Sequence, residues 1–422
     1  MALGLGATMQ ALVDIPGERH YDIIGFDPRG VGFTTPSAAC YTNEFARAVD
    51  ALQMEGMPSV MTEQGVKVRF ETKKARLQYL GFSYGSVLGN TFASMFPERV
   101  GRMVVDGIAD AEDYFMGTWQ KNINQAEEAV DIFYNTCFNA GTQCALRSRS
   151  DRSAADIRAR INTLLQSLQQ TPVSTVHNSR VYIVSSYHIS EVIRTSLYTP
   201  INSYETLSFA LAEALAGNFS RILTNPNVMP SDLASSVCTT TAQTSPPQNP
   251  NAHINEAAIA IICGDSQASA GTRDYPWSLQ TVSRITNQST TVGEAWTKIP
   301  LACAEWPFTP VYSFTGPFGS PAPNKRRQDK TPLAPMLILS TRTDHATPVA
   351  NAFALSKLHG KAAVVVQESV GHCALLSSPS GCTIGHVREY FATGKVPRNG
   401  TVCMPDCVPE IPFKACPGLP VV

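Results

Sequence analysis

One serine lies between two glycines in the stretch GFSYG at residues 81–85, which is a G-x-S-x-G pattern. The apolar run 77–80 before it predicts a strand, and residues 86–95 after it predict a helix. A serine on such a strand-to-helix turn is placed to act as a nucleophile, because the glycines let the turn close and the helix N-terminus stabilises negative charge. The alternative is an ordinary turn serine. Ser83 is therefore our candidate nucleophile.

A candidate base and a candidate orienting acid follow later in the chain. A serine hydroxyl needs an imidazole base and a carboxylate, and enzymes with this turn place them in the order Ser, Asp or Glu, His. Asp344 lies in STRTDHATP after a predicted strand at 336–340, and His372 lies in ESVGHCALL after a predicted strand at 362–367. One helix-strand unit separates the two, so we expect them on adjacent loops of one sheet.

Other interpretations of these residues stay open. Asp344 could cap the helix predicted at 349–358, and His372 could be a structural histidine. His345 is next to Asp344, but it precedes a strand, which is the wrong order for the base. His386 follows Cys382 by four residues, and we expect it on a helix surface.

The elements that must position these residues alternate between strand and helix. YDIIGF at 21–26 and GRMVVDG at 101–107 predict further strands, and residues 43–54 predict a helix. Strand, helix and strand with short connections indicate a parallel, doubly wound α/β sheet.

The middle of the chain has a different character. Helical periodicity dominates residues 115–290, where RVYIVSS alone predicts a strand, one that need not join the sheet, and residues 225–252 predict a long loop. We therefore divide the chain into an N-terminal core part at 1–114, a mostly helical cap at 115–330 and a C-terminal core part at 331–422.

Composition excludes several classes of partner. The chain has 422 residues and a net charge of −1, so nothing favours nucleic-acid or membrane-surface binding. No apolar run reaches the roughly 18 residues of a membrane-spanning helix. The eleven cysteines lack C-x-x-C spacing, which favours disulfides over a metal site. Sequons begin at Asn218, Asn287 and Asn399, yet the N-terminus lacks the basic region of a secretory signal.

With these residues in place, the chain resembles the tripeptidyl-aminopeptidase-like branch of the α/β-hydrolases, relatives of prolyl aminopeptidases. The resemblance covers most of residues 20–395. The stretches that show it are YDIIGFDPRGVGFTTP with Cys40, LGFSYGSVLGNTFASMFPERVGRMVVDGIADAEDY, AIICGD with CAEWPF, and PMLILSTRTDHATPVANAFALSKLHGKAAVVVQESVGHC.

The resemblance implies an α/β-hydrolase fold, with a mostly parallel sheet flanked by helices and a helical cap. It implies Ser83 as nucleophile, Asp344 as orienting acid and His372 as base, with no cofactor. It also implies secretion and release of short peptides from free N-termini. The disulfides would be Cys137–Cys144, Cys263–Cys303 and Cys373–Cys382.

The chain departs from this pattern near its N-terminus. Relatives carry a glycine-rich loop that donates an N–H to the oxyanion hole, whereas this sequence begins with MALGLGATMQAL; the backbone N–H of Tyr84 is the other donor. Few residues separate Gly32 from Ser83, and Cys40 lacks an evident partner. We expect an incomplete N-terminal part of the sheet, from either a shortened gene product or a degenerate relative.

The predicted activity is that of a serine hydrolase that removes short peptides through an acyl-enzyme. An acidic cap residue would hold the substrate ammonium, and Glu112 and Asp113 lie near the cap boundary. The alternatives are hydrolysis of a small ester or lactone, or an inactive protein that only binds. We expect a peptide or small ester as partner, no metal and no cofactor, and leave the oligomeric state open.

Overall fold

A computed structural model describes residue 10 and residues 76–225, 254–266, 273–304, 306–308, 310 and 313–412. Within these residues five strands, all parallel, form one sheet in the order β1-β2-β5-β6-β7. Their bounds are Leu77–Phe82, Val100–Asp106, Leu337–Thr343, Ala363–Val370 and Thr401–Cys403. The predicted parallel sheet is confirmed there, while the predicted strand at 21–26, the helix at 43–54 and Cys40 lie outside the described residues.

Both faces of the central strands β2, β5 and β6 are largely buried, which explains continuous apolar runs such as 103–105, 337–339 and 363–366 in place of strict alternation with polar residues. Side chains along a strand point alternately to opposite faces. Met103 and Val105 accordingly pack in one apolar cluster, whereas Val104, between them, packs in another. Each cluster needs its own layer of helices.

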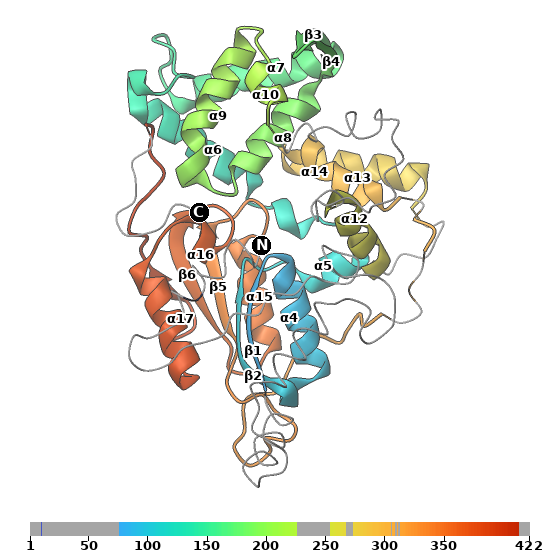
Figure 1. The fold of residues 1–422 in the computed structure, drawn as a ribbon, viewed down its shortest axis with the longest axis vertical. Helices are drawn as coiled ribbons and strands as arrows, with labels where there is room; N and C mark the ends of the chain where they lie inside the picture. The colour runs from blue at the N-terminus through green and yellow to red at the C-terminus, as the bar shows by residue number, and fades with distance from the viewer. Residues whose placement is uncertain are drawn as a thin grey trace, which may run out of the picture.

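Helices supply those two layers. On one face α4 (Tyr84–Met95) and α15 (Val349–Leu358) cover the first cluster. On the other face α16 (Ala374–Ser377) and α17 (Gly381–Thr393) cover the second. In Figure 1, α17 lies on the left of the strands, and α15 and α4 lie on the right of β5 and β6. No helix within the described ranges has the length and apolar character needed to cross a membrane.

Between β2 and β5 the chain builds a mostly helical layer above the carboxyl ends of the strands (Figure 1). Its helices are α5 (Ala111–Met116), α6 (Ala126–Ala140), α7 (Ala154–Gln170), α8 (Ser186–Ser196), α9 (Pro200–Leu215), α10 (Ser220–Leu223), α12 (Ile254–Asp265), α13 (Tyr275–Gln288) and α14 (Gly293–Ala302). Strand β4 (Arg180–Val184) pairs only with β3 (Val173–His177), so this predicted strand lies outside the main sheet. The domain limits at 114 and 330 stay predictions, and nearly all of the predicted loop 225–252 lies outside the described residues.

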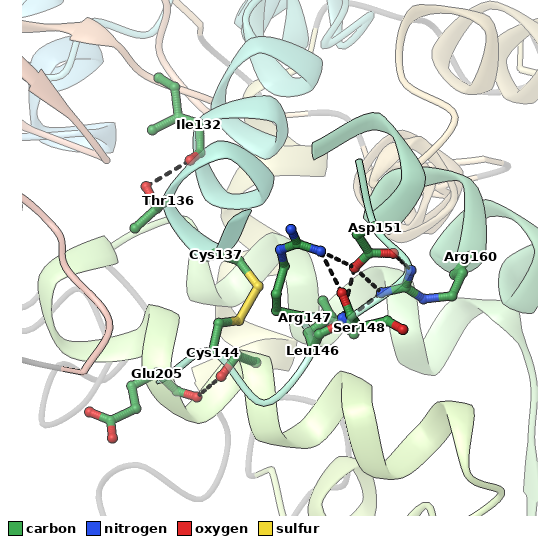
Figure 2. Close-up of a disulfide and its surroundings, with 11 residues drawn as sticks. Ile132, Thr136, Cys137, Cys144, Leu146, Arg147, Ser148, Asp151, Arg160 and Glu205 are labelled. Carbon is green, nitrogen blue, oxygen red and sulfur yellow. Dashed lines mark hydrogen bonds and ion pairs between the residues drawn. A yellow bond between two sulfur atoms is a disulfide. The ribbon is translucent and has the colours of Figure 1, made fainter. Parts of the chain in front are cut away.

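The disulfides agree with two of the three expected pairs. Cys137–Cys144 and Cys263–Cys303 are formed. Figure 2 shows the first, which joins the end of α6 to the following turn beside a buried Asp151 that binds Arg147 and Arg160. The expected Cys373–Cys382 pair is wrong.

The reason lies in where the chain places the two sulfurs. Cys382 bonds Cys403 across the start of α17 and the edge strand β7. Cys373 is a buried free thiol, and its Sγ donates to the carbonyl oxygen of Asp106 at 3.4 Å. Proximity in sequence therefore did not indicate proximity in space.

Candidate active site

Ser83 lies on a strained turn between β1 and α4. Its backbone has φ 53° and ψ −114°, a left-handed value that L-residues with a side chain rarely adopt. Two hydrogen bonds hold it there: its N–H donates to the Asp106 carbonyl at 2.9 Å, and its own carbonyl accepts from the Ser86 hydroxyl at 2.6 Å. These two bonds hold the strained backbone conformation and so keep the serine at the tip of the turn.

Two flanking glycines and a tyrosine beneath them make this turn possible. A Cβ on Gly81 would lie 2.7 Å from the Gly85 carbonyl oxygen and 2.5 Å from the Tyr79 ring. The Tyr79 hydroxyl donates to that same Gly85 carbonyl at 2.7 Å. Any side chain at Gly81 would therefore force the turn apart.

Asp344 and His372 lie together on adjacent loops, after β5 and β6. The His372 Nδ1 is 3.0 Å from Asp344 Oδ2 and 3.2 Å from Oδ1. Thr347 was not singled out in the sequence, but its hydroxyl donates to Asp344 Oδ2 at 2.6 Å and lies 3.0 Å from His372 Nδ1. Its position three residues after Asp344 was the feature of the sequence that could have indicated this contact.

The Asp344 carboxylate is fully buried, yet it stays ionised. Burial alone would raise its pKa, but attraction to His372 and the hydrogen bonds lower the pKa of Asp344 to about 2. For His372, burial acts to lower the pKa, and the charge and hydrogen bond of Asp344 overcome this, so that its pKa is raised. The pair therefore favours a histidine that holds a proton readily.

The competing interpretation of Asp344 as a helix cap is wrong. The N-cap of α15 is Pro348. Asp344 Oδ1 instead accepts the N–H groups of Ala346 and Thr347, each at 2.8 Å, within its own loop. These bonds fix the carboxylate toward His372.

The His372 imidazole lies near the end of β2, where the serine turn is also anchored. Nε2 is buried and makes no hydrogen bond to any described residue, including Ser83. A Cβ on Gly107 would lie 3.2 Å from His372 Cε1. Ser83 binds the carbonyl of Asp106, the residue before Gly107, so the imidazole and the serine meet at the end of β2. Catalytic hydrogen bonds are often long in an empty site and shorten when substrate binds.

The other histidines have different surroundings. His345 packs its ring against Tyr198 with centroids 4.6 Å apart, and burial lowers its pKa to about 3, so it is neutral. Tyr198 also accepts the backbone N–H of His372 through its carbonyl at 3.0 Å. His386 is partly exposed on α17 as expected.

A possible metal site can be set aside. Among the described residues, Cys382, His386 and Cys403 bring three ligand atoms within 4.8 Å of one another. Both sulfurs are bonded to each other, and a disulfide offers no thiolate to a metal. While the disulfide is formed, this cluster does not fit a metal ion.

The two acidic residues considered for the substrate ammonium are not placed alike. Asp113 is buried and already accepts bonds from Thr118 and from the Lys121 N–H, while Glu112 is exposed. A third carboxylate, Asp265 at the end of α12, accepts the Tyr114 hydroxyl at 2.8 Å and the Tyr84 hydroxyl at 3.4 Å. Since Tyr84 follows Ser83, Asp265 is a carboxylate of the helical layer that is hydrogen-bonded next to the serine turn.

The parallel sheet and the serine turn between β1 and α4 have the arrangement of the α/β-hydrolase fold. The family model described as "alpha/beta hydrolase fold" matches residues 8–142, and the model described as "TAP-like protein" matches residues 288–403. The first match contains Ser83, and the second contains Asp344 and His372. The resemblance to tripeptidyl-aminopeptidase-like serine peptidases is thereby confirmed.

Curated relatives agree with that assignment. A tripeptidyl aminopeptidase of Streptomyces lividans is 23% identical over 93% of this chain and 72% of its own length. The serine protease Hip1 of Mycobacterium tuberculosis is 23% identical over 95% of this chain and 78% of its own. A putative hydrolase, YuaR, of Escherichia coli is 26% identical over 47% of this chain and 42% of its own. These relatives and the fold support a hydrolase of the serine peptidase type.

Proposed function

We propose that the protein is a serine exopeptidase that releases short peptides from free N-termini, with Ser83 as nucleophile, His372 as base and Asp344 as orienting acid. The observation that carries this proposal is the meeting of a strained serine turn with a buried Asp-His pair at one end of the sheet. The peptidase names of the relatives support the choice of substrate.

In the first half of the reaction, Ser83 Oγ attacks the scissile carbonyl carbon while His372 Nε2 takes the hydroxyl proton. Asp344 holds Nδ1–H and stabilises the imidazolium that forms. The Tyr84 N–H lies in the first turn of α4, whose N–H groups point out of the helix end and stabilise the oxyanion. Collapse of the tetrahedral intermediate expels the amine, which takes the proton from His372.

In the second half, water attacks the acyl-enzyme. His372 Nε2, now neutral, takes a proton from that water, and a second tetrahedral intermediate forms at the same carbon. Its collapse breaks the bond to Ser83 Oγ, which regains the proton from His372. The short N-terminal peptide leaves as its carboxylic acid, and the enzyme returns to its starting state.

Preference for a free N-terminus requires an anion that holds the substrate ammonium at a fixed distance from Ser83. Asp265 has the charge and the place for this, since its carboxylate bonds the hydroxyl of Tyr84. The Tyr114 hydroxyl donates a second bond to it, and the rings of Tyr84 and Tyr114 lie 5.8 Å apart. The carboxylate lies on the cap, where an exopeptidase needs the group that limits the length of the released peptide.

The test compares peptide anilides that have free or acetylated N-termini, together with an aryl ester. Wild-type protein should prefer the free peptide, and Asp265→Asn should raise KM for that peptide about 10- to 100-fold, the worth of a charge-assisted bond. The aryl ester should be hydrolysed equally by both. Glu112→Gln is the matched control, because that carboxylate is exposed on α5. Preference for the ester over every peptide would instead assign an esterase.

We also propose that the protein acts outside the cytosol. The disulfides at Cys137–Cys144, Cys263–Cys303 and Cys382–Cys403 are compatible with an oxidising compartment. The sequon residues Asn218, Asn287 and Asn399 are exposed, as glycosylation requires. Mass analysis before and after glycosidase treatment of the protein from its natural source tests this; an unglycosylated, fully reduced protein would contradict it.

A further inference from the structure

We propose that Asp106 is a positioning residue, whose carboxylate holds the loop of His372 in place against the nucleophile turn. The inference rests on the proposed role of His372 as the base. Asp106 ends β2, the strand between those that carry Ser83 and Asp344. It touches neither the hydroxyl of Ser83 nor the imidazole by a hydrogen bond, so its effect passes through the backbone.

The carboxylate binds the chain directly after the base. Oδ1 accepts the N–H of Ala374 at 2.7 Å, and Oδ2 accepts the N–H of Leu375 at 2.9 Å. These are the first two residues of α16, which begins two positions after His372. One side chain thus fixes the backbone on which the base is carried.

The backbone carbonyl of the same residue fixes the nucleophile. It accepts the Ser83 N–H at 2.9 Å and lies 3.4 Å from the Cys373 sulfur. Asp106 therefore ties the serine turn with its main chain and the histidine loop with its side chain. A shift of this residue would move the two reacting groups relative to each other.

The two N–H groups bound by the Asp106 side chain require a carboxylate. Asp106 is fully buried, and within the described part of the chain no Lys, Arg or His forms an ion pair with it. An ionised group without a counter-ion is costly to bury. Both of its oxygens accept N–H groups, a pattern that neither asparagine nor serine can reproduce, because asparagine would present a donor to one of the two N–H groups.

Its charge also acts on the base. Burial raises the pKa of Asp106 to about 6 against the two N–H bonds, so the group is ionised at neutral and alkaline pH. That charge adds to the larger effect of Asp344 in raising the pKa of His372. The titratable and charged groups around Asp106 and His372 are Asp344, His345, Cys373, Arg194 and Tyr198.

The experiment measures the rate constant for fluorophosphonate labelling of Ser83 as a function of pH. Asp106→Asn keeps the size but loses the charge and one acceptor. We expect labelling to slow by about 10- to 100-fold, as for a base displaced by a fraction of an ångström to one ångström. We also expect the acid inflection of the profile to move to lower pH, because a negative charge beside His372 is gone. A merely structural role would leave the inflection in place.

Asp151→Asn is the matched control. Asp151 is also a buried carboxylate that accepts a backbone N–H, from Ser148 at 2.8 Å, but it lies in the cap beside the Cys137–Cys144 disulfide (Figure 2). It should leave the labelling profile of the folded protein unchanged. Equal rates and equal inflections for wild type and Asp106→Asn would overturn the inference.

Asp106→Glu keeps the proposal testable if the asparagine variant does not fold. It retains the charge, so the inflection should stay at the wild-type pH, while the extra methylene displaces the loop and slows labelling. A wild-type rate in this variant would overturn the inference. Absence of Ser83-dependent labelling in the wild-type protein would instead contradict the proposed function itself, so the two failures are distinguishable.

Discussion

Asp344, Thr347 and His372 form a buried cluster in which the carboxylate binds Nδ1 of His372 and Nε2 has no partner among the described residues. The carboxylate accepts from two loop N–H groups, one hydroxyl and the imidazole. Such a carboxylate is ionised and rigid, so the imidazole tautomer is set with Nδ1 protonated and Nε2 ready to accept. These contacts support the proposed division of roles between the acid and the base.

Activity should depend on pH through His372. The base must be neutral to accept the serine proton, and its pKa is raised above the ordinary value of 6.5, so kcat/KM should fall as pH drops through an inflection above 6.5. Asp344 has a pKa of about 2 and stays ionised throughout that range. Asp344→Asn should lower the inflection and reduce kcat by roughly 10⁴-fold.

The measurement is kcat/KM against pH for a peptide anilide, with both proteins. Asp344 also links stability to pH: its lowered pKa stabilises the fold above 3.8, and that contribution is lost as pH falls toward 2. An inflection below 6.5 in the wild-type protein, or one unchanged in Asp344→Asn, would show that His372 is not the titrating base.

Sequence order was enough to predict which acid and histidine lie together, because loops after neighbouring parallel strands meet at one sheet edge. It could not identify the supporting residues Thr347, Tyr198 and Asp106. Their roles arise from contacts between distant segments, such as the Tyr198 carbonyl on the His372 N–H. The wrong Cys373–Cys382 pair has the same origin, since the fold carries Cys403 to Cys382 and turns Cys373 inward.

At the scale of the elements, the turn between β1 and α4 depends on glycine for space rather than for unusual dihedral angles. Gly81→Ala should destabilise the protein by about 1–3 kcal/mol, because the new Cβ meets the Gly85 carbonyl and the Tyr79 ring. Activity should fall further than stability alone explains, since the turn carries Ser83. Thermal unfolding and peptidase activity of the same sample measure the two effects.

Gly385→Ala provides the matched comparison within a helix. A Cβ there meets nothing within 4 Å, and Gly385 lies inside α17, where alanine is the better helix former. The substitution should stabilise the protein by about 0.5–1 kcal/mol and leave activity unchanged. If both alanine variants behaved alike, the close approach at the serine turn would not control the fold there.

The sequence pattern predicted the described core elements well, because β2, β5 and β6 contain continuous apolar runs and single helices connect β1 to β2 and β5 to β6. The expected helix at 349–358 has those bounds, whereas α4 begins two residues earlier than expected, directly after Ser83. Strand β3 was not predicted, because Val173–His177 has only two valines, spaced three residues apart, and among the described residues it pairs with β4 alone. A two-stranded hairpin needs few apolar residues, so its sequence gives little indication of strands.

At the scale of the whole molecule, disulfides brace the cap and the C-terminal edge. Cys263–Cys303 closes a separation of 40 residues between α12 and the end of α14, whereas Cys137–Cys144 closes only 7. In the chain-entropy account, their removal costs about 4 and 2 kcal/mol respectively. The paired serine substitutions at Cys263 and Cys303 should therefore lower the urea midpoint more than those at Cys137 and Cys144; the reverse order would contradict this.

The loss of the Cys263–Cys303 disulfide should also change substrate preference, because α12 ends in Asp265. A looser α12 should weaken discrimination between free and acetylated N-termini more than it changes hydrolysis of the aryl ester. The same comparison after removal of Cys137–Cys144, at the far side of the cap, supplies the reference. The cap thus links the stability of the molecule to its proposed specificity.

The most direct test of the central claim is to map, by mass spectrometry of proteolytic peptides, where a fluorophosphonate attaches. We predict one adduct, on Ser83 in the peptide containing GFSYG, formed by the wild-type protein and lost in Ser83→Ala and His372→Ala. Absence of an adduct on Ser83 in folded wild-type protein, or equal labelling in the His372→Ala protein, would contradict a Ser83 nucleophile activated by His372.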